Sequence, residues 1–525
     1  QKGTLSSTAA LKITTGAFDN SHAGNVSTSD TLDITAGQLT NQDGGRLTSN
    51  KALIAKVTGL DQQGGKLFSN TSVALDLNHG QLNNQGGLIN GPLLMLKNLK
   101  GVNNQGGELS SAQAFTLAAD SLDNSNGKLL SNQALTLRIN QALSNVKGLI
   151  AAQSIDGRAA SLDNSGGTLT SRGDTSFNVD GQLSNQNQGL INAANTLTLN
   201  STGLNNQGGS VLGKSIAIDL GSATGDLNNS AGLITTDGQL TITHLRDLSN
   251  QGGEISTAQN LNLSGRTLDN STGKLISNNL LTLSGNKLVN QSGLISGWQG
   301  VSISGADLDN RNQGTVSSRY GNVDATLSNS LLNSGAGALV SQKALTVKAA
   351  SLDNSDKGIL SSAGGQTLTV TGLLNNAQGG LIDSGAALDL QAQTLNNAGG
   401  TVNAQQALSL IGTSLDNSAG TLIGNGTVTL DLLGALTNTN GKLASAGALL
   451  LKRATEINNQ GGQLASQGLL TLFAGSLDNR NRGTVAANGA LAITTTGAVQ
   501  NSGDGLIYSQ NADLKLKAAS LDNAK

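Results

Sequence analysis

Apolar and polar residues alternate along short stretches of this chain, and glycine and asparagine interrupt the alternation. Segment 134–137 reads Ala-Leu-Thr-Leu and segment 196–199 reads Thr-Leu-Thr-Leu. A period of two predicts a half-buried strand with leucine inward and threonine outward. A second kind of strand follows glycine, as in Gly-Lys-Leu-Leu-Ser at 127–131, and a third short stretch carries a Leu-x-Asn signature. Gly, Asn and Ser separate the strands, where turns need residues that tolerate positive φ.

These three stretches recur in the same order along the whole chain. The last position of the Leu-x-Asn signature occurs 25 times at intervals of 19 to 23 residues, on average about 21, and only Gln62 departs from asparagine there. One such unit cannot enclose a core, but stacked units can, because each strand pairs with its equivalent one coil later. The pattern predicts an all-β parallel β-helix, a solenoid of about 25 coils, as one continuous region over residues 1–525.

Two other repeat folds fit the pattern less well. Helical solenoids use units of roughly 33 residues or more, with helix-forming faces. Leucine-rich repeats share the unit length, but they require a Leu-x-x-Leu-x-Leu-x-x-Asn register that this sequence does not follow. The short units, rich in Gly, Asn and Thr, therefore favour the β-helix.

The near-constant asparagine predicts a ladder of side-chain amides that hydrogen-bond along the solenoid axis. Asparagine is also simply a good turn former, and the two explanations are compatible. The ladder is favoured because a turn alone would accept glycine or aspartate as readily. The candidate ladder residues are Asn104, Asn124, Asn145, Asn164, Asn185, Asn206, Asn270, Asn290 and Asn310.

The residue before the repeat asparagine gives a second test of stacking. It is aspartate in ten units, and no two of these units are consecutive. Stacking in register would place consecutive carboxylates about 5 Å apart, which costs stability. Duplication of a double unit would also produce the alternation, and both explanations presuppose the same repeat. The ten residues are Asp19, Asp61, Asp123, Asp163, Asp269, Asp309, Asp353, Asp416, Asp478 and Asp522.

Composition removes several classes of protein. The chain has no Cys, one Pro, 2% aromatic residues, 12% charged residues and a net charge of −2. Disulfide frameworks and thiolate metal sites are excluded, and the absence of a basic cluster argues against nucleic-acid binding. No apolar run approaches the length of a membrane-spanning helix. The first residues do not form a signal peptide, so we expect an internal fragment of a longer protein.

The sequence predicts neither a catalytic site nor a metal site. The three histidines, His22, His79 and His244, occupy different positions in their units, so no metal site or cofactor is expected. No interval is long enough to hold a loop that forms a cleft, and neither a calcium-binding nonapeptide nor a phosphate loop is present. We therefore expect no enzymatic activity, and a β-helix enzyme acting on polysaccharides is the least favoured alternative.

One corner of the repeat carries unusual residues. Pro92, Arg172 and Trp298 all lie eight positions after a repeat asparagine, which predicts an exposed and permissive corner. Trp298 is expected to cover this corner rather than to bind a ligand. Arg172, Gly173 and Asp174 form a tripeptide that integrins recognise in some adhesins. So short a motif also arises by chance in a glycine-rich chain, and coincidence is the favoured explanation.

The units at 162–171 and 204–209 resemble the repeats of filamentous haemagglutinins. These are large exoproteins that Gram-negative bacteria export by two-partner secretion, and they include adhesins and the stick-like toxins of contact-dependent growth inhibition. The resemblance implies a single-stranded, right-handed parallel β-helix and a place in the extended shaft. It also implies an outer-membrane transporter as the partner during export, and a secreted, extracellular or outer-membrane-associated location.

The resulting expectation is a structural shaft that holds a receptor-binding or toxin domain away from the producing cell. A target-cell receptor or host surface would then be contacted through other parts of the parent protein, because the chain shows no secretion domain and no toxin domain. The alternative is that the shaft is itself an adhesin for glycans or host cells, through its rows of Thr, Ser, Asn and Gln.

Overall fold

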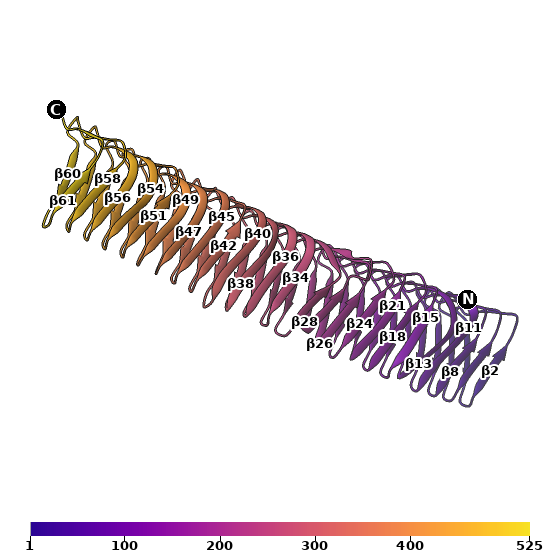
Figure 1. The fold of residues 1–525 in the computed structure, drawn as a ribbon. Coiled ribbons are helices and arrows are strands. Elements are labelled where there is room, and N and C mark those ends of the chain that lie inside the picture. Colours follow the sequence, from indigo (N-terminus) through magenta and orange to yellow (C-terminus); the bar gives the residue numbers. More distant parts are fainter. Residues whose placement is uncertain (1, 525) are drawn as a thin grey trace. The chain divides into compact units, whose positions relative to one another are not determined.

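The computed structural model describes residues 2–524, and in that range every regular element is a β-strand and no helix occurs. The chain divides into two compact units, Gln1–Gln259 and Asn260–Lys525. Each unit is a solenoid of short parallel strands that follow one another coil by coil (Figure 1). The predicted parallel β-solenoid of about 25 turns, with about 21 residues in each, is confirmed.

One coil of the first unit shows the three predicted strands. They are β17 (Lys128–Ser131), β18 (Ala134–Ile139) and β19 (Ala142–Ser144). In other coils the second and third strands merge, as in β34 (Leu261–Asp269) of the second unit. They merge because the chain stays paired with the next coil across the bend between them.

The strands pair in parallel and in register with their equivalents in adjacent coils. Leu129 of β17 is paired with Leu109 in the coil before it and with Ile150 in the coil after it. In the second unit, Leu390 of β47 (Leu388–Asn396) is paired in the same way with Leu368 and Leu410. Equivalent residues therefore lie directly over one another, as the repeat predicts.

The core of each coil is a small cluster of inward-facing aliphatic side chains. In β18, Leu135 and Leu137 are fully buried while Thr136 between them faces outward. Stacking places these leucines on the equivalent residues of the next coil and removes their side chains from water. This burial stabilises the fold by about 25 cal/mol for each Å² of apolar surface. Many small equivalent cores explain how a chain with 2% aromatic residues folds.

One aromatic residue fills a space that a neighbouring coil leaves open. Gly157 lies between Leu137 and Phe177 in the stack. A Cβ atom at Gly157 would lie only 2.2 Å from the Phe177 ring, so the ring occupies the volume that a leucine side chain would otherwise take. Phe177 is completely buried. Packing density is thus maintained by a small and a large residue from adjacent coils.

One polar residue in the second unit breaks the apolar stack. Gln366 in β45 (Gln366–Asn375) lies between Leu345 and Leu388 and is 2% exposed. Neither its side-chain nitrogen nor its side-chain oxygen has a hydrogen-bond partner. An unpaired buried polar group costs about 1–3 kcal/mol, so Gln366 is a local weak point.

Candidate functional site: the stacked asparagine turn

The repeat asparagine lies in a tight turn that joins the third strand of one coil to the first strand of the next. In the first unit, β16 (Ser121–Asp123) ends before Asn124, and β17 begins at Lys128. The backbone N–H of Gly127 donates to the carbonyl of Asn124 at 2.9 Å, and Asn126 takes a φ of 56°. The turn directs the Asn124 side chain inward, where it is fully buried.

The buried amides form a hydrogen-bonded column along the coils of each unit. Nδ2 of Asn124 donates to Oδ1 of Asn145 at 2.7 Å, and it also lies 3.3 Å from the carbonyl oxygens of Gly127 and Leu149. All nine candidate ladder asparagines have their amides buried, and equivalent Nδ2–Oδ1 bonds of 2.6 to 2.8 Å link them to neighbouring turns. They are Asn104, Asn124, Asn145, Asn164, Asn185 and Asn206 in the first unit, and Asn270, Asn290 and Asn310 in the second.

Gln62 interrupts the column in the first unit. Asn41 donates to Oε1 of Gln62 at 2.8 Å, so the column reaches this coil from one side. The longer side chain then carries its nitrogen past the next amide, and Nε2 donates to the carbonyl of Leu88 at 3.3 Å. Oδ1 of Asn84 is left buried without a partner. The substitution was visible in the sequence, but the broken bond depends on the geometry.

The last position of each turn is so crowded that only glycine fits there. A Cβ atom at Gly107 would lie 2.1 Å from the backbone oxygen of Asn84 and 2.8 Å from Oδ1 of Asn104. At the equivalent glycines, such as Gly127 and Gly209, a Cβ atom would meet the backbone oxygen of the asparagine in the preceding turn and Oδ1 of the asparagine in the same turn. The turn therefore brings the backbone against the asparagine column so closely that no side chain fits between them.

The glycine before it has a different role. Gly106 has a φ of 62° and no atom within 4 Å of its Cβ position, so only its backbone conformation favours glycine. Lys147, Thr272 and Ser292 adopt similar φ values, 54° to 57°, at the equivalent position. Positive φ alone was the reason expected for glycine in these turns, and the steric requirement of the second glycine was not predicted. The second glycine recurs in repeat after repeat, and this recurrence was the signal in the sequence that could have revealed the requirement.

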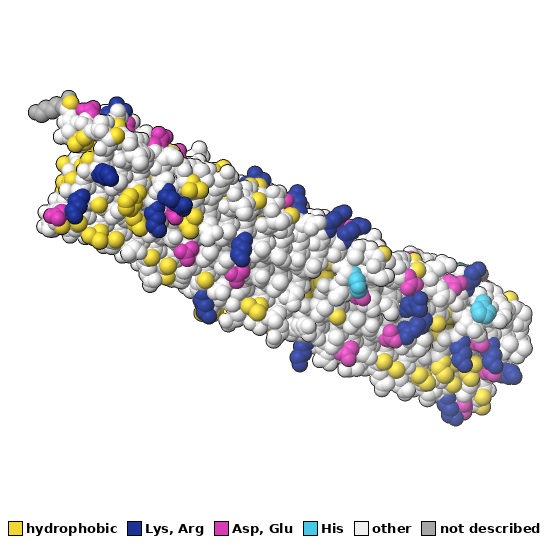
Figure 2. Space-filling view, viewed as in Figure 1, with side chains coloured by type: hydrophobic (Ala, Val, Ile, Leu, Met, Phe, Trp, Pro, Cys, Tyr) yellow, Lys and Arg dark blue, Asp and Glu magenta, His cyan; other side chains and the backbone are white. Residues whose placement is uncertain are grey.

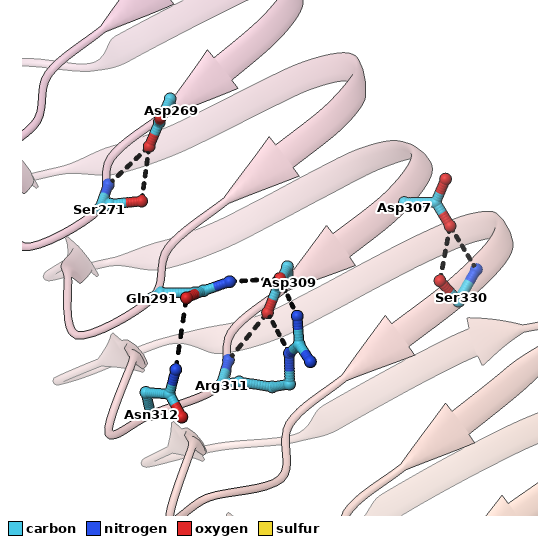
Figure 3. Close-up of polar contacts among 8 residues, drawn as sticks. All are labelled: Asp269, Ser271, Gln291, Asp307, Asp309, Arg311, Asn312 and Ser330. Atoms are coloured by element: carbon cyan, nitrogen blue, oxygen red, sulfur yellow. Dashed lines mark hydrogen bonds and ion pairs between the residues drawn. The ribbon is translucent and has the colours of Figure 1, made fainter.

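A second polar row lies just outside the column. Asp163 pairs in register with Ser144 and Ser184 of the adjacent coils, so each carboxylate in such a row is flanked by neutral side chains. Oδ1 of Asp163 accepts hydrogen bonds from the backbone and the hydroxyl of Ser165, at 2.9 and 2.5 Å. Asp269 caps its turn in the same way through Ser271 (Figure 3).

Two turns of the second unit replace that serine with arginine. Arg311 donates to both carboxylate oxygens of Asp309 at 2.8 and 2.9 Å, and Gln291 of the preceding turn donates to Oδ2 at 2.6 Å (Figure 3). Burial raises the pKa of Asp309, but these hydrogen bonds outweigh it, so the pKa lies below its ordinary value. At Asp478, the hydrogen bond from Arg480 is the main cause of a lowered pKa.

The tripeptide Arg172, Gly173 and Asp174 lies in the bend between β23 (Thr168–Ser171) and β24 (Thr175–Val179). Arg172 and Asp174 are exposed, but the bend is fastened to its neighbours. The guanidinium of Arg172 donates to the carbonyl of Asn132 at 2.8 Å, and Oδ1 of Asp174 accepts from the backbone of Thr196 at 3.1 Å. The two charged side chains are thus engaged with other coils.

Histidines and charged groups are scattered over the molecule. His22 and His244 each lie beside one aspartate of another coil, at 3.2 Å from Asp43 and 2.6 Å from Asp219. Within residues 2–524, no cluster of three or more metal-ligating side chains is found. No helix in the same range is long and apolar enough to cross a bilayer. On the face drawn in Figure 2, acidic and basic side chains are interspersed over a mostly uncharged surface.

The buried asparagine side chains thus form a column in which amides of adjacent coils hydrogen-bond to one another. Comparison with protein families agrees with this repeat architecture. No curated protein and no solved structure matches the chain. The haemagglutinin repeat family matches it eight times, at residues 1–92, 74–145, 135–187, 175–252, 217–312, 316–402, 383–440 and 444–503. These matches cover far more than half of the sequence, and the chain belongs to the haemagglutinin repeat family.

Proposed function

We propose that this chain is the shaft of a secreted cell-surface filament that projects a receptor-binding or toxin domain away from the bacterial cell. The observation that carries the proposal is regularity, since successive coils within each unit keep the same order of strand segments and are joined by equivalent turns. A solenoid of this kind is stabilised by contacts between neighbouring coils, so its length can grow without a larger core. Such a filament would serve adhesion or contact-dependent inhibition.

The same proposal places the shaft outside the cell, secreted or held at the outer membrane, after export through a two-partner-secretion transporter. Two features support export in an unfolded form: the chain has no Cys, so no disulfide can form, and one Pro, so only one peptide bond is subject to slow prolyl isomerisation. Each coil that emerges can pair with the coil already formed. A target-cell receptor or host surface would be met by other parts of the parent protein.

Removing whole coils tests the spacer function. Deletion of residues 355–479 joins Asn354 to Arg480 and removes six coils, because Asn354 and Asn479 occupy equivalent turns. Each coil contributes about 4.8 Å, so the second unit becomes roughly 29 Å shorter. We expect export and folding to persist, while attachment to target cells or their inhibition falls because the projected domain reaches less far.

Duplication of residues 355–479 in the parent protein is the matched control, since it changes the same coils without shortening the reach. Activity is expected to be retained in the lengthened protein. Equal activity of the shortened and natural proteins, at equal surface amounts, would overturn the spacer function. Attachment that persists after removal of every part of the parent outside residues 1–525 would favour direct adhesion by the shaft.

One observation favours that second candidate. A groove of about 790 Å³ crosses the first four coils of the first unit and is lined largely by hydroxyl groups, with an aromatic ring at one side. Ser6, Ser27, Thr48 and Phe68 stack in register along it. Hydroxyl rows and a ring suit carbohydrate. Retention of the purified chain on a glycan array, and its loss on replacing Thr48 and Phe68 with alanine, would support this candidate.

A further inference from the structure

A cluster of large side chains stands at one corner of the second unit. Trp298 lies between β37 (Leu294–Gly297) and β38 (Gly300–Asp309), and Tyr320 lies in the bend before β40 (Asn322–Leu332). Because these coils are paired in register, the two bends stack, and the backbone N–H of Tyr320 donates to the carbonyl of Trp298 at 2.7 Å. The chain has one Trp and two Tyr, and two of these three residues meet here.

Arg319 joins the two rings. The ring centroids of Trp298 and Tyr320 are 6.2 Å apart at an interplanar angle of 69°, an edge-to-face contact. The guanidinium carbon of Arg319 lies 5.1 Å from the first ring centre and 5.4 Å from the second. Cation–π attraction at these distances holds the guanidinium in place. Trp298 is 38% exposed and Tyr320 49% exposed, so the cluster faces solvent.

Arg319 differs from Arg311 and Arg480, the arginines of the asparagine turns, in the charged groups that surround it. Among the residues that the structure describes, Arg319 forms no ion pair, whereas Arg311 and Arg480 are each held by an aspartate. The exposed residues of the flanking corners are amides or cations: Asn278 precedes the cluster, and Gln342 and Lys343 follow it. The guanidinium is therefore oriented by rings and keeps its capacity to bind a carboxylate.

We propose that Trp298, Arg319 and Tyr320 bind a carboxylated polysaccharide that runs along the coils. The guanidinium would donate two parallel hydrogen bonds to the oxygens of a carboxylate. The rings would pack against the sugar C–H groups, as amphipathic aromatic side chains do at wet interfaces. The flanking amides would pair with sugar hydroxyls. This site goes beyond the shaft function and does not depend on it.

A saccharide fits this surface better than a protein partner does. Stable protein interfaces bury about 800 Å² on each side around an apolar centre, whereas this corner offers two rings, with the exposed Leu280 in the preceding coil and amides and a lysine in the flanking bends. Stacked coils repeat at about 4.8 Å, which is close to the length of one pyranose unit in an extended chain. From the sequence, Trp298 was expected to cover the corner rather than to bind a ligand, because nothing in the repeat shows that Arg319 and Tyr320 meet it.

The single tryptophan supplies the test. Fluorescence excited selectively at Trp298 reports on this corner alone, because the chain has no other Trp. We would titrate the full chain with oligogalacturonate and, separately, with a neutral maltooligosaccharide of equal length. The expected result is a saturable change with the carboxylated sugar alone. Arg319→Gln should weaken binding about tenfold or more, since a charged hydrogen-bonded contact is removed, and Tyr320→Ala should also weaken it.

Arg482→Gln is the matched control, because Arg482 is another exposed arginine and the equivalent turn position already carries glutamine at Gln313. Its binding should equal that of the natural protein. Urea unfolding of each variant separates loss of binding from loss of fold. No saturable response of the natural chain would overturn the proposal. So would an equal response to the neutral sugar, or equal weakening by Arg319→Gln and Arg482→Gln.

Discussion

Nδ2 of Asn104 donates a 2.6 Å hydrogen bond to Oδ1 of Asn124, twenty residues further along the chain. The two side chains belong to adjacent coils and are fully buried. Neither can turn to water, so each depends on the other and on nearby carbonyl groups for its hydrogen bonds. In the second unit, Asn290 and Asn310 repeat the relationship at 2.7 Å. Buried networks of this kind are costly to interrupt at any single member.

Replacing Asn124 with alanine should therefore destabilise the first unit. The change leaves Oδ1 of Asn145 without its donor and removes one acceptor of Asn104. We expect a loss of about 2–4 kcal/mol in the free energy of unfolding, measured by urea denaturation. Asn132→Ala, at an exposed asparagine of the same coil, is the control and should change little. Equal effects of the two substitutions would show that the column is not stabilising.

The two glycines of one turn should respond differently to alanine. Gly107→Ala forces a methyl group against the backbone oxygen of Asn84 and should cost about 3 kcal/mol or more, because the surrounding backbone must shift. Gly106→Ala meets no neighbouring atom and should cost about 1 kcal/mol, the penalty of a left-handed conformation. Thermal unfolding of both variants measures the difference. A larger loss at Gly106 would contradict the steric account.

Gln62→Asn should repair the interrupted column. The shorter side chain would place its amide nitrogen beside Oδ1 of Asn84, which is buried without a partner. We expect a gain of about 1–2 kcal/mol in the stability of the first unit. Gln63→Asn, at the exposed neighbouring position, controls for the change in side-chain length. A neutral or destabilising effect of Gln62→Asn would mean that the local backbone cannot adopt the geometry of the other turns.

Gln366→Leu tests the defect in the apolar stack of the second unit. Both polar side-chain atoms of Gln366 lack partners, and its neighbours in the stack are Leu345 and Leu388. A leucine of similar volume should raise the free energy of unfolding by about 2 kcal/mol. Gln391→Leu on the exposed face should give no comparable gain. An unchanged unfolding midpoint for Gln366→Leu would show that the amide is satisfied in solution.

Acid should weaken the arginine-capped turns. The hydrogen bond from Arg480 lowers the pKa of Asp478 in the folded protein, whereas an unfolded aspartate titrates near about 3.9. The stabilisation is therefore fully present above about pH 4 and is lost as the pH falls through the folded-state pKa. Asp478→Asn should lower stability by less than about 1 kcal/mol at pH 7, because the Arg480 side chain is 41% exposed.

The stability difference between the natural protein and Asp478→Asn should shrink as the pH falls below about 4. Urea midpoints measured between pH 3 and pH 7 would follow it. Asp389→Asn, at an exposed aspartate elsewhere in the second unit, provides the comparison. A difference that stays constant with pH would rule out an ionised Asp478 as its source.

The repeat was sufficient to predict the strands, their register and the inward asparagine. Each repeat of about 21 residues must bury the leucines of its alternating Leu-Thr-Leu pattern. Stacking of the repeats is the simplest fold that buries them all. The spacing of the aspartates pointed to the same register, and the in-register pairing of Asp163 with Ser144 agrees with it. The strand pattern and the asparagine turn recur along the whole chain and the aspartates in ten repeats, which is why a single sequence reveals them.

Features that belong to one coil escaped prediction. Phe177 fills the space above Gly157 only because those positions face each other across adjacent coils. The unpaired Oδ1 of Asn84 depends on how far the Gln62 side chain reaches. The contact of Arg319 with Trp298 depends on the path of an exposed bend. Such pairings depart from the repeat, so the pattern common to all repeats does not show them.

Cross-linking through introduced cysteines tests the stacking of equivalent residues most directly, because the chain has no cysteine of its own. Asp123 and Ser144 are register partners on adjacent coils, within the distance that a disulfide spans. The pair Asp123→Cys and Ser144→Cys should oxidise readily, whereas Asp123→Cys with Ala142→Cys, shifted by two residues, should stay reduced. Preferential oxidation of the shifted pair, or of neither pair, would contradict the register on which this account rests.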